Sequence, residues 1–450
     1  MSSIGRAVVV QKFGGSSVAD AGKMKLCAQR VVEERRAGRA VVVVVSAMGD
    51  ATDDLIDLAK TAAEIPDRRE LDQLLATGEQ VSVAMFALVL QGMGLEAVSL
   101  TGAQAVIRTD AAFGRAMITR VDSSRIREEL RAGRVPVVCG FQGVTEHGET
   151  TTLGRGGSDT TAVALAGALI EAGDAAACDI YKDVEGVYTA DPRLVPDARR
   201  REVVTYDEML EAAALGSQVI HPRAIEVAKK YGVPLRVLHS HRPGGGGAET
   251  GTRVLGEDPE MESRIVSSVV LKRNVGRVSL RGLSNRPGIQ AAVFGPIAGA
   301  GISVDDIIQE DDGPGTINLT FTIDRKDLAE ITPIVHKAAA DLAGAQARAP
   351  EAVRFDVGLS TVSVVGAGMR TSAGVASMLF EALAAEGVLI ENITTSEIRI
   401  SCVVSEAVGE RALRAAHEAF GLGSAEREAA LAAGVGVTMA ARGGRVGAGG

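Results

Sequence analysis

The chain contains no tryptophan, and aromatic residues make up only 3% of its 450 residues. Lys and Arg number 48 against 57 Asp and Glu, so the net charge is −9. Nucleic-acid binding needs clustered positive charge and aromatic stacking platforms, so no nucleic-acid partner is expected. No apolar run reaches the roughly 18 residues of a membrane span, and residues 1–7 have no secretory character. We therefore expect a cytoplasmic protein without membrane contact.

Several chemical signatures are also missing. The four cysteines, Cys27, Cys139, Cys178 and Cys402, are scattered with no C-x-x-C pair, so neither a zinc site nor a disulfide framework is indicated. There is no G-x-x-x-x-G-K-[ST] motif, no G-x-G-x-x-G after a strand, and no H-E-x-x-H, G-x-S-x-G or H-R-D signature. A phosphate site must therefore be built in another way, and no metal site made of protein ligands is expected.

In the first half, short Val- and Ile-rich runs alternate with longer helical patterns. Strands are predicted at Ala7–Gln11, Ala40–Ser46, Val135–Phe141, Asp179–Tyr181 and Pro234–His239. Helices are predicted at about 19–37, 52–63, 70–92, 122–132, 158–172, 206–214 and 222–231, with Ser158 or Asp159 as an N-cap. This alternation predicts a three-layer α/β/α domain with a mostly parallel sheet. Ligands then bind at the carboxyl ends of the strands.

The second half contains a repeat. Residues 240–252 are rich in glycine and are predicted to be a flexible linker that ends the first region near 256. Beyond it, Val278–Gly282 matches Val362–Gly366 at a spacing of 84, and Gly288 matches Gly374 at a spacing of 86. Each copy predicts a βαββαβ module of the α+β class. We expect domains at 1–256, 257–345 and 346–441, with strand exchange between the last two left open, and a disordered tail at 442–450.

Two glycine-rich segments are candidates for binding phosphate and substrate. Gln11–Ser17 (QKFGGSS) follows the first strand and opens a helix, so its amides and Lys12 can face an anion, although a plain strand-to-helix turn is the alternative. Thr150–Thr161 (TTTLGRGGSDTT) places Arg155 between two glycines. Its guanidinium has the planar shape that suits a carboxylate. An N-cap alone does not explain that arginine or the three threonines.

In combination, these segments resemble aspartate kinases of the amino acid kinase superfamily. The resemblance extends through Val43–Asp50 with Thr52, Ala76–Glu79 and Asp179–Arg193. It covers nearly the whole chain, because aspartate kinases also carry two C-terminal ACT modules, which the repeat resembles. It implies transfer of the γ-phosphoryl group of MgATP to the β-carboxylate of L-aspartate, giving 4-phospho-L-aspartate and ADP. That reaction is the first step of lysine, threonine and methionine biosynthesis.

The resemblance also implies residue roles. Lys12 contacts the transferred phosphoryl group and Asp159 orients Lys12. Arg155 binds an aspartate carboxylate and Glu79 the α-ammonium, and the neutral hydrogen bonds come from Ser46, Thr52 and Ser158. The expected ATP-binding residues are Lys12, Phe13, Gly14, Gly15, Lys182, Asp183, Tyr188, Thr189, Ala190, Asp191, Pro192, Arg193 and Gln218. Mg²⁺ is expected to be held mainly by phosphates and water. An aspartate side chain with a pKa of about 3.9 is already ionised at pH 7, so no general base is needed.

One position departs from the family pattern. Before the helix at 222–231 the family usually has a lysine near the nucleotide phosphates, whereas this chain has Gln218. Glutamine can donate a hydrogen bond but carries no charge. The loss of one charged contact is expected to weaken nucleotide binding by about 1.5–3 kcal/mol without abolishing activity.

The ACT pair resembles the family's sensor of lysine, threonine or both. Its expected pocket comprises Asn285, Arg286, Pro287, Gly288, Ile289, Gln290, Ser303, Val304, Asp305, Gln309, Thr395, Ser396 and Glu397. Related chains often have Asp where Asn285 stands, so effector capture is in question, and a purely structural dimerisation module is the alternative. A homo-oligomer through the ACT domains is expected. Met261 leaves open a separate regulatory chain and an α2β2 assembly, although an ordinary linker methionine is the alternative.

Two other functions stay open at this point. One is another carboxylate kinase of the same superfamily, such as one that acts on glutamate. The other is a catalytically weak, amino-acid-sensing subunit, which Gln218 and the long ACT half would suit. The joint presence of Lys12, Glu79, Arg155 and Asp159 favours an active aspartate kinase.

Overall fold

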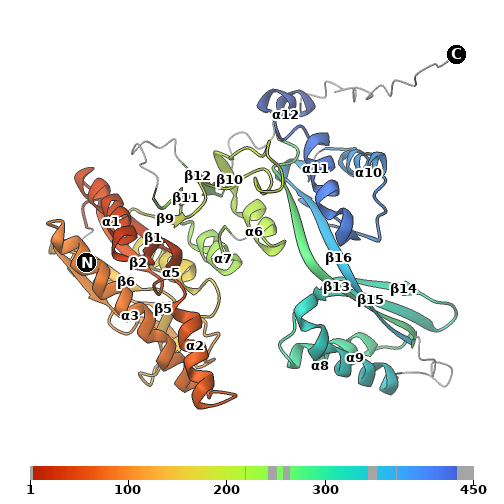
Figure 1. The fold of residues 1–450 in the computed structure, drawn as a ribbon, viewed down its shortest axis with the longest axis horizontal. Helices are drawn as coiled ribbons and strands as arrows, with labels where there is room; N and C mark the ends of the chain where they lie inside the picture. Colours follow the sequence, from red (N-terminus) through yellow and green to blue (C-terminus); the bar gives the residue numbers. More distant parts are fainter. Residues whose placement is uncertain are drawn as a thin grey trace. The chain divides into compact units, whose positions relative to one another are not determined.

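The computed structural model describes residues 4–217, 219–241, 251–256, 264–342, 352–370 and 372–432. Within these residues the chain forms two compact units (Figure 1). The first contains 4–189 and 199–256, and the second contains 190–198 and 264–432. Gln218, Met261 and the tail 442–450 lie outside the described residues, as do the predicted junction at 345/346 and most of the predicted linker.

An eight-stranded sheet forms the centre of the first unit. Its strand order is β10-β12-β11-β9-β1-β2-β6-β3, and every neighbouring pair is parallel except β11 with β12. The strands are β1 (Val8–Phe13), β2 (Ala40–Val45), β3 (Ala97–Leu100), β6 (Val135–Cys139), β9 (Ala176–Lys182), β10 (Val203–Thr205), β11 (Leu235–His239) and β12 (Thr252–Leu255). The mostly parallel sheet predicted from the alternation of strands and helices is confirmed.

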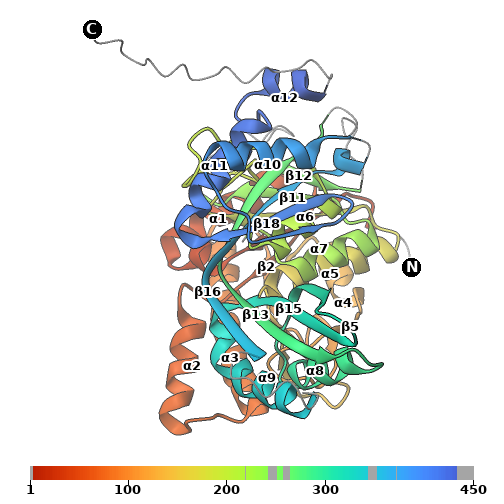
Figure 2. The same ribbon diagram turned by 90° about the vertical axis from the view of Figure 1, so that its right-hand side faces the viewer.

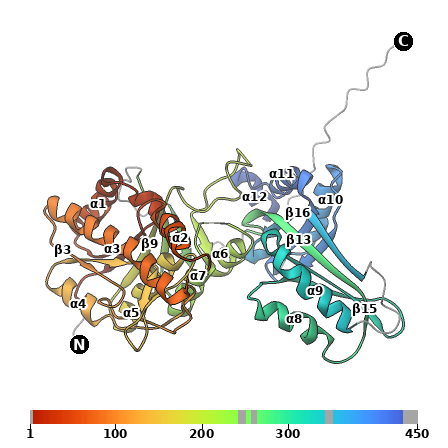
Figure 3. The same cartoon turned by 60° about the horizontal axis from the view of Figure 1, so that its bottom comes forward.

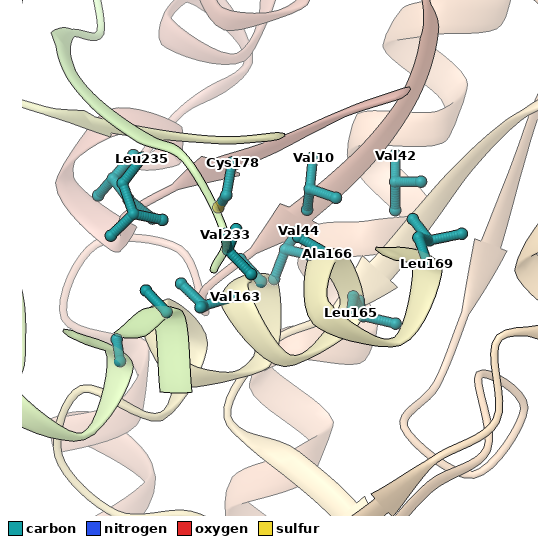
Figure 4. Close-up of a cluster of buried hydrophobic side chains, with 14 of the residues drawn as sticks. Val10, Val42, Val44, Val163, Leu165, Ala166, Leu169, Cys178, Val233 and Leu235 are labelled. Carbon is teal, nitrogen blue, oxygen red and sulfur yellow. The ribbon is translucent and has the colours of Figure 1, made fainter. Parts of the chain in front are cut away.

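Helices cover both faces of this sheet. They are α1 (Ala21–Arg36), α2 (Ala51–Ala62), α3 (Arg68–Gly92), α4 (Ser124–Arg131), α5 (Gly157–Glu171), α6 (Tyr206–Ala214) and α7 (Pro222–Tyr231). In β2, Val42 and Val44 pack in one core with α5, while Val41 and Val43 pack in the other with α1 and α3 (Figure 4). Because successive side chains of a strand face opposite sides, an all-valine strand needs a helix layer on each side.

A second, four-stranded sheet supports the segment that carries Arg155. Its order is β5-β4-β7-β8, with β4 (Ile107–Thr109), β5 (Ile118–Val121), β7 (Gln142–Val144) and β8 (Thr150–Thr152). The strands β7 and β8 form an antiparallel pair, and α5 begins five residues after β8. The predicted N-cap is wrong: α5 has Gly156 as its N-cap residue, with φ of 70°, so Ser158 and Asp159 lie inside its first turn.

The flexible loop or linker predicted over 240–252 is wrong at Thr252, which begins a strand, and its first residue is buried. Ser240 is fully buried at the end of β11 and donates to the carbonyl oxygen of Lys182. Thr252 begins β12, which pairs with β10 and β11 inside the sheet. The residues between 242 and 250 lie outside the described part. Turn-forming composition therefore concealed a strand that lies between β10 and β11 in the sheet.

Among the described residues, α3 is the one helix that is long and apolar enough to cross a membrane by length and composition. One of its faces is buried: Val83, Phe86 and Leu90 pack with α1 and the sheet. The same helix also buries the carboxylates of Asp72 and Glu79. These features are typical of a core helix in a globular domain. The predicted cytoplasmic location stays a prediction.

A six-stranded antiparallel sheet with the order β14-β15-β13-β16-β18-β17 organises the second unit. Its strands are β13 (Ser268–Ser284), β14 (Asp305–Asp311), β15 (Thr316–Asp324), β16 (Val353–Val365), β17 (Asn392–Thr395) and β18 (Arg399–Ser405), and its main helices are α8 (Ile289–Gly299), α9 (Leu328–Leu342), α10 (Val375–Ala385), α11 (Gly409–Ala419) and α12 (Ala425–Ala432). The long strands β13 and β16 lie side by side and each serves both modules (Figure 2). Helices α8 and α9 cover the first module (Figure 3).

The first half of β13 completes the second module. Ser268–Lys272 pair with Thr361–Val365, which in turn pair with β18. The later residues 277–280 of β13 pair instead with 353–356 and with β15. The edge strand of the second module therefore comes from the residues that precede the first module.

The segment 190–198 belongs to the second unit, whereas the domain expectation assigned it to the first. Ala190 and Val195 are buried in one core with Leu413 of α11. Arg414 also donates to the carbonyl oxygen of Leu194. The first unit resumes with Arg199, whose carbonyl oxygen accepts from the amide of Thr189. The segment 190–198 is too short for a change of composition to be visible in the sequence.

Candidate functional site

A cleft of about 410 Å³ lies at the carboxyl ends of β1, β2 and β9. It brings together eleven of the predicted site residues: Lys12, Gly14, Gly15, Ser46, Thr52, Glu79, Arg155, Ser158, Asp159, Lys182 and Asp183. These residues belong to separate segments of the chain, between residues 12 and 183, which the fold brings together. This location agrees with the general rule for ligand sites in parallel sheets.

Lys12 and Asp159 form a buried ion pair at the base of the cleft. The Lys12 Nζ atom lies 2.7 Å from Asp159 Oδ1, and both side chains are about 5% exposed. Lys182 lies on the other oxygen, with its Nζ 3.3 Å from Asp159 Oδ2. Burial alone would raise the pKa of Asp159, but the two lysines outweigh it and hold that pKa at about 2. Two cations thus share one carboxylate, which leaves net positive charge in the cleft.

Lys12 is the last residue but one of β1. Burial lowers its pKa below the usual value, and the attraction of Asp159 opposes this effect. The glycine turn that follows fits tightly against the end of β2, because a Cβ on Gly15 would lie 2.8 Å from the carbonyl oxygen of Ala47 and 3.0 Å from that of Gly49. Only glycine allows the backbone to approach this closely. The turn leaves backbone amides accessible beside a cation, and an anion site requires both.

Glu79 lies in the cleft on the inner face of α3. Its Oε1 accepts a 3.0 Å hydrogen bond from the Ala47 amide, while Oε2 is buried and has no hydrogen-bond partner within the described residues. Burial raises the pKa of Glu79 to about 7. A buried carboxylate oxygen without a donor is suited to an ammonium group, which would satisfy the oxygen and lower its pKa.

Arg155 is an exposed residue of the cleft, which Ser46 and Ser158 also line. Ser46 Oγ donates to Ser158 Oγ over 2.9 Å. Arg155 lies between Gly154 and Gly156, whose φ angles are 73° and 70°. A Cβ on Gly156 would also come within 2.1 Å of the His221 ring, so this position requires glycine for two reasons.

Other predicted ATP-binding residues lie elsewhere. The side chain of Phe13 is fully buried and stacks on Tyr181, with ring centroids 4.7 Å apart, so only its backbone is available to a ligand. Tyr188 and Thr189 do not line the cleft; Tyr188 donates to Glu185. Ala190, Asp191, Pro192 and Arg193 belong to the second unit, where Ala190 is buried in the core and Arg193 pairs with Asp191.

The cleft is also lined by residues to which no role was assigned from the sequence. Ser16, Ser17, Gly154, Gly156, Gly157 and Tyr181 lie within the motifs, whereas Phe141 lies outside them, at the end of a predicted strand. Phe141 has a φ of 67°, which is unusual for an aromatic residue and typical of strain at functional sites. Phe141 and Tyr181 lie at or just past the carboxyl ends of predicted strands. That position at the carboxyl end of a strand was the available signal.

The predicted effector residues cluster at the start of α8 and along β14. Gln290 Nε2 donates to Gln309 Oε1 over 2.8 Å, so these two expected residues lie together. Gly288, with a φ of 90°, is the N-cap residue of α8. Thr395 ends β17 in the second module, and Glu397 pairs with Arg370. The two modules are joined where Thr394 donates to Asp306 over 2.9 Å.

The described residues contain no group of three or more His, Cys, Asp or Glu that could hold a metal ion. In the cleft, Asp159 is already engaged by two lysines, and Asp183 is exposed. Any metal there would depend on ligands from a bound nucleotide.

Comparison with known proteins agrees with this arrangement. Residues 7–239 match the amino acid kinase family, and residues 278–340 and 362–420 match ACT domains. An aspartokinase from Pseudomonas aeruginosa is 47% identical over 422 residues, which cover 94% of this chain and 99% of the relative.

Two crystal structures of aspartokinase III from E. coli are similar over almost their whole length. The complex with aspartate and ADP, described as the R-state, has a TM-score of 0.75 and 27% identity and covers 92% of this chain and 99% of that one. The complex with lysine and aspartate, described as the T-state, has a TM-score of 0.71 and 27% identity and covers 91% and 99%. The chain described here therefore belongs to the amino acid kinase family and, within it, to the aspartate kinases.

Proposed function

We propose that this protein transfers the γ-phosphoryl group of ATP to the β-carboxylate of L-aspartate, giving 4-phospho-L-aspartate and ADP. The observation that carries the proposal is the cleft itself. It combines the Lys12–Asp159–Lys182 group, next to the glycine turn, with Glu79 and Arg155, which suit the two ends of a zwitterionic amino acid. A related protein has been crystallised with aspartate and ADP.

The chemistry needs no proton transfer. The aspartate side chain is already a carboxylate at pH 7, so its oxygen attacks the γ-phosphorus directly while the bond to the leaving ADP oxygen breaks. The barrier arises from the approach of an anion to a polyanion. Lys12 and Lys182, together with the Gly14 and Gly15 amides, supply fixed positive charge where the equatorial oxygens develop charge. Asp159 holds both lysines without neutralising them.

Other residues that line the cleft are suited to positioning the substrate. We assign Arg155 to the aspartate α-carboxylate and Glu79 to its ammonium group, with Ser46, Thr52 and Ser158 as neutral donors. Mg²⁺, bound with the nucleotide, supplies further neutralisation of the phosphates. We propose that phosphates and water hold it, because Asp159 is already engaged by lysines and Asp183 is a lone exposed carboxylate. Contacts of Tyr188–Arg193 and Gln218 with ATP stay predictions.

Regulation is proposed on the same basis. Two ACT modules in one sheet, and a related enzyme crystallised with lysine, support lysine, threonine or both as effectors. We propose that an effector favours one quaternary arrangement of a homo-oligomer built through the ACT domains, and that the enzyme supplies lysine, threonine and methionine biosynthesis. A separate regulatory chain starting at Met261 is a further possibility for the assembly. Rates unaffected by millimolar lysine and threonine, singly and together, would contradict the regulatory part.

The decisive experiment compares acceptors. ADP release is measured with aspartate, glutamate and N-acetylglutamate, and the acyl phosphate product is trapped with hydroxylamine. We expect aspartate to exceed the other two by at least about 100-fold in kcat/KM, because one added methylene misplaces the carboxylate by more than 1 Å. A preference for glutamate or acetylglutamate would identify another carboxylate kinase, whereas negligible turnover of all three would favour a sensing subunit.

A further inference from the structure

The loop Leu153–Gly157, which carries Arg155, contains three glycines. Arg155 is flanked on both sides by glycines in the left-handed region, and its own side chain is exposed. Glycines allow many backbone conformations, so the loop itself does not fix the direction of the guanidinium. An arginine that must meet a carboxylate in one geometry needs its backbone held by other residues.

Asp72 holds this segment from α3. Its Oδ2 accepts from the Thr152 amide over 2.7 Å and from the Gly114 amide over 2.9 Å, and its Oδ1 accepts from Thr152 Oγ1 over 2.7 Å. The carboxylate is fully buried. Two of these bonds come from the end of β8, just before Leu153, and the third comes from the turn that follows β4, so Asp72 ties both segments to α3.

Arg223 holds the same two segments from α7. Its Nη1 donates to the carbonyl oxygen of Leu153 over 2.6 Å, and its Nη2 donates to that of Ala116 over 2.9 Å. A further backbone bond joins the Ala116 amide to the Thr152 carbonyl oxygen over 2.9 Å. An acidic and a basic side chain, from helices 150 residues apart in the sequence, therefore both bridge residues 114–116 and 152–153.

We propose that Asp72 and Arg223 are positioning residues for Arg155, a pair that we call the loop clamp. This inference rests on the proposed function, because it assumes that Arg155 binds a carboxylate of aspartate. Neither residue lines the cleft, so each acts through the backbone on which Arg155 is mounted. Lys12 and the glycine turn lie on other segments and do not depend on these bonds. The loop clamp should therefore govern the affinity for aspartate and leave the affinity for ATP unchanged.

Two conservative variants test the loop clamp. Arg223→Lys keeps the charge but cannot donate from two fixed nitrogens, and Asp72→Asn keeps the shape but loses an acceptor. Each is expected to raise the KM for aspartate about 10-fold or more while the KM for ATP changes less than about 2-fold. Arg36→Lys, at an exposed position of α1, and Asp57→Asn, at an exposed ion pair of α2, serve as matched controls and should change neither constant.

A double-mutant cycle separates positioning from general damage. In an Arg155→Ala background, Arg223→Lys should have little further effect on the KM for aspartate, because the side chain being positioned is absent. An equal further loss in that background, or a parallel rise of both KM values, would overturn the inference.

A readout independent of turnover keeps this test separate from the proposed function. Amide hydrogen exchange of residues 152–157 should increase in Arg223→Lys and remain at the parent level in Arg36→Lys. Unchanged exchange in Arg223→Lys would overturn the loop clamp even if aspartate is the substrate. Absence of aspartate phosphorylation by the parent protein, with faster exchange in Arg223→Lys, would instead contradict the proposed function alone.

Discussion

The ammonium group of Lys12 and the carboxylate of Asp159 lie 2.7 Å apart, and the residues that carry them stand 147 positions apart in the sequence. One comes from the end of β1 and the other from the first turn of α5. Lys182, from the end of β9, approaches the second oxygen. The three elements therefore meet at one carboxylate, and the fold fixes the cations before any nucleotide arrives.

Removal of either partner should affect turnover far more than substrate binding. Lys12→Met and Asp159→Ala are each expected to lower kcat by at least about 100-fold, because fixed charge at the transferred phosphoryl group stabilises mainly the transition state. Steady-state kinetics of purified variants provide the measurement. Lys60→Met, at an exposed ion pair of α2, is the control. Changes below about 3-fold in both site variants would favour a sensing subunit.

Much of this site could be predicted from the sequence because the motifs sit directly after strands. Lys12 and Lys182 end parallel strands, so the topology alone brings them to one edge of the sheet. Glu79 could be found through its motif, although its unpaired oxygen depends on burial by β2 and α3. Asp72 and Arg223 carried no signal, because all but one of their partners are backbone atoms, whose positions depend on tertiary packing.

Elements with a strong hydrophobic pattern could be predicted from the sequence. Elements whose position depends on tertiary packing were missed. The valine run of β2 predicted a strand buried on both faces, which the structure confirms. The strand β12 has only four residues and follows a glycine-rich stretch, so local composition pointed to a linker. The placement of 190–198 with the second unit depends on a few buried side chains such as Val195. Contacts made by a few side chains leave no periodic hydrophobic pattern in the sequence.

Glu79 should make aspartate binding depend on pH. Its pKa is raised to about 7, so the free enzyme holds a protonated, neutral Glu79 below that pH. The ammonium of aspartate prefers the ionised form, and kcat/KM for aspartate should therefore increase through about pH 7. Glu79→Gln should flatten this dependence and raise the KM. A profile that is flat between pH 6 and 8 in the parent enzyme would contradict the assignment.

The same titration has a consequence for stability. Since the pKa of Glu79 is higher in the folded state than the ordinary value of 4.5, its contribution favours folding below about pH 4.5 and is lost as the pH rises through about 7. Glu79→Gln should therefore gain stability relative to the parent protein between pH 6 and 8, as measured by urea denaturation. Added aspartate should reduce this difference.

The glycine turn should not accept a side chain at Gly15. In Gly15→Ala the new Cβ would meet the carbonyl oxygens of Ala47 and Gly49, both backbone atoms that cannot move aside. The turn must shift, which displaces the amides that we assign to the phosphates. We expect the KM for ATP to rise about 10-fold or more. Gly92→Ala, at a helix position with open space around it, is the matched control and should behave as the parent.

A lysine in place of Gln218 should tighten nucleotide binding. One charged hydrogen bond contributes about 1.5–3 kcal/mol, so Gln218→Lys is expected to lower the Kd for an ATP analogue by about 10- to 100-fold. Isothermal titration gives the value directly. Gln218→Ala should weaken binding slightly. An affinity unchanged by the lysine would show that the departure from the family pattern has no energetic consequence.

The attachment of 190–198 to the second unit can be tested through stability. Val195 is 5% exposed in a core with Leu379, Leu413 and Phe420, so Val195→Ala removes two buried methyl groups and should cost about 2 kcal/mol. The loss should speed amide exchange in α10 and α11 and leave α1 and α3 unchanged, because the latter pack in a separate core. Val357→Ala, at an exposed position of β16, should be close to neutral. Faster exchange in α1 and α3 would mean that this segment stabilises the first unit instead.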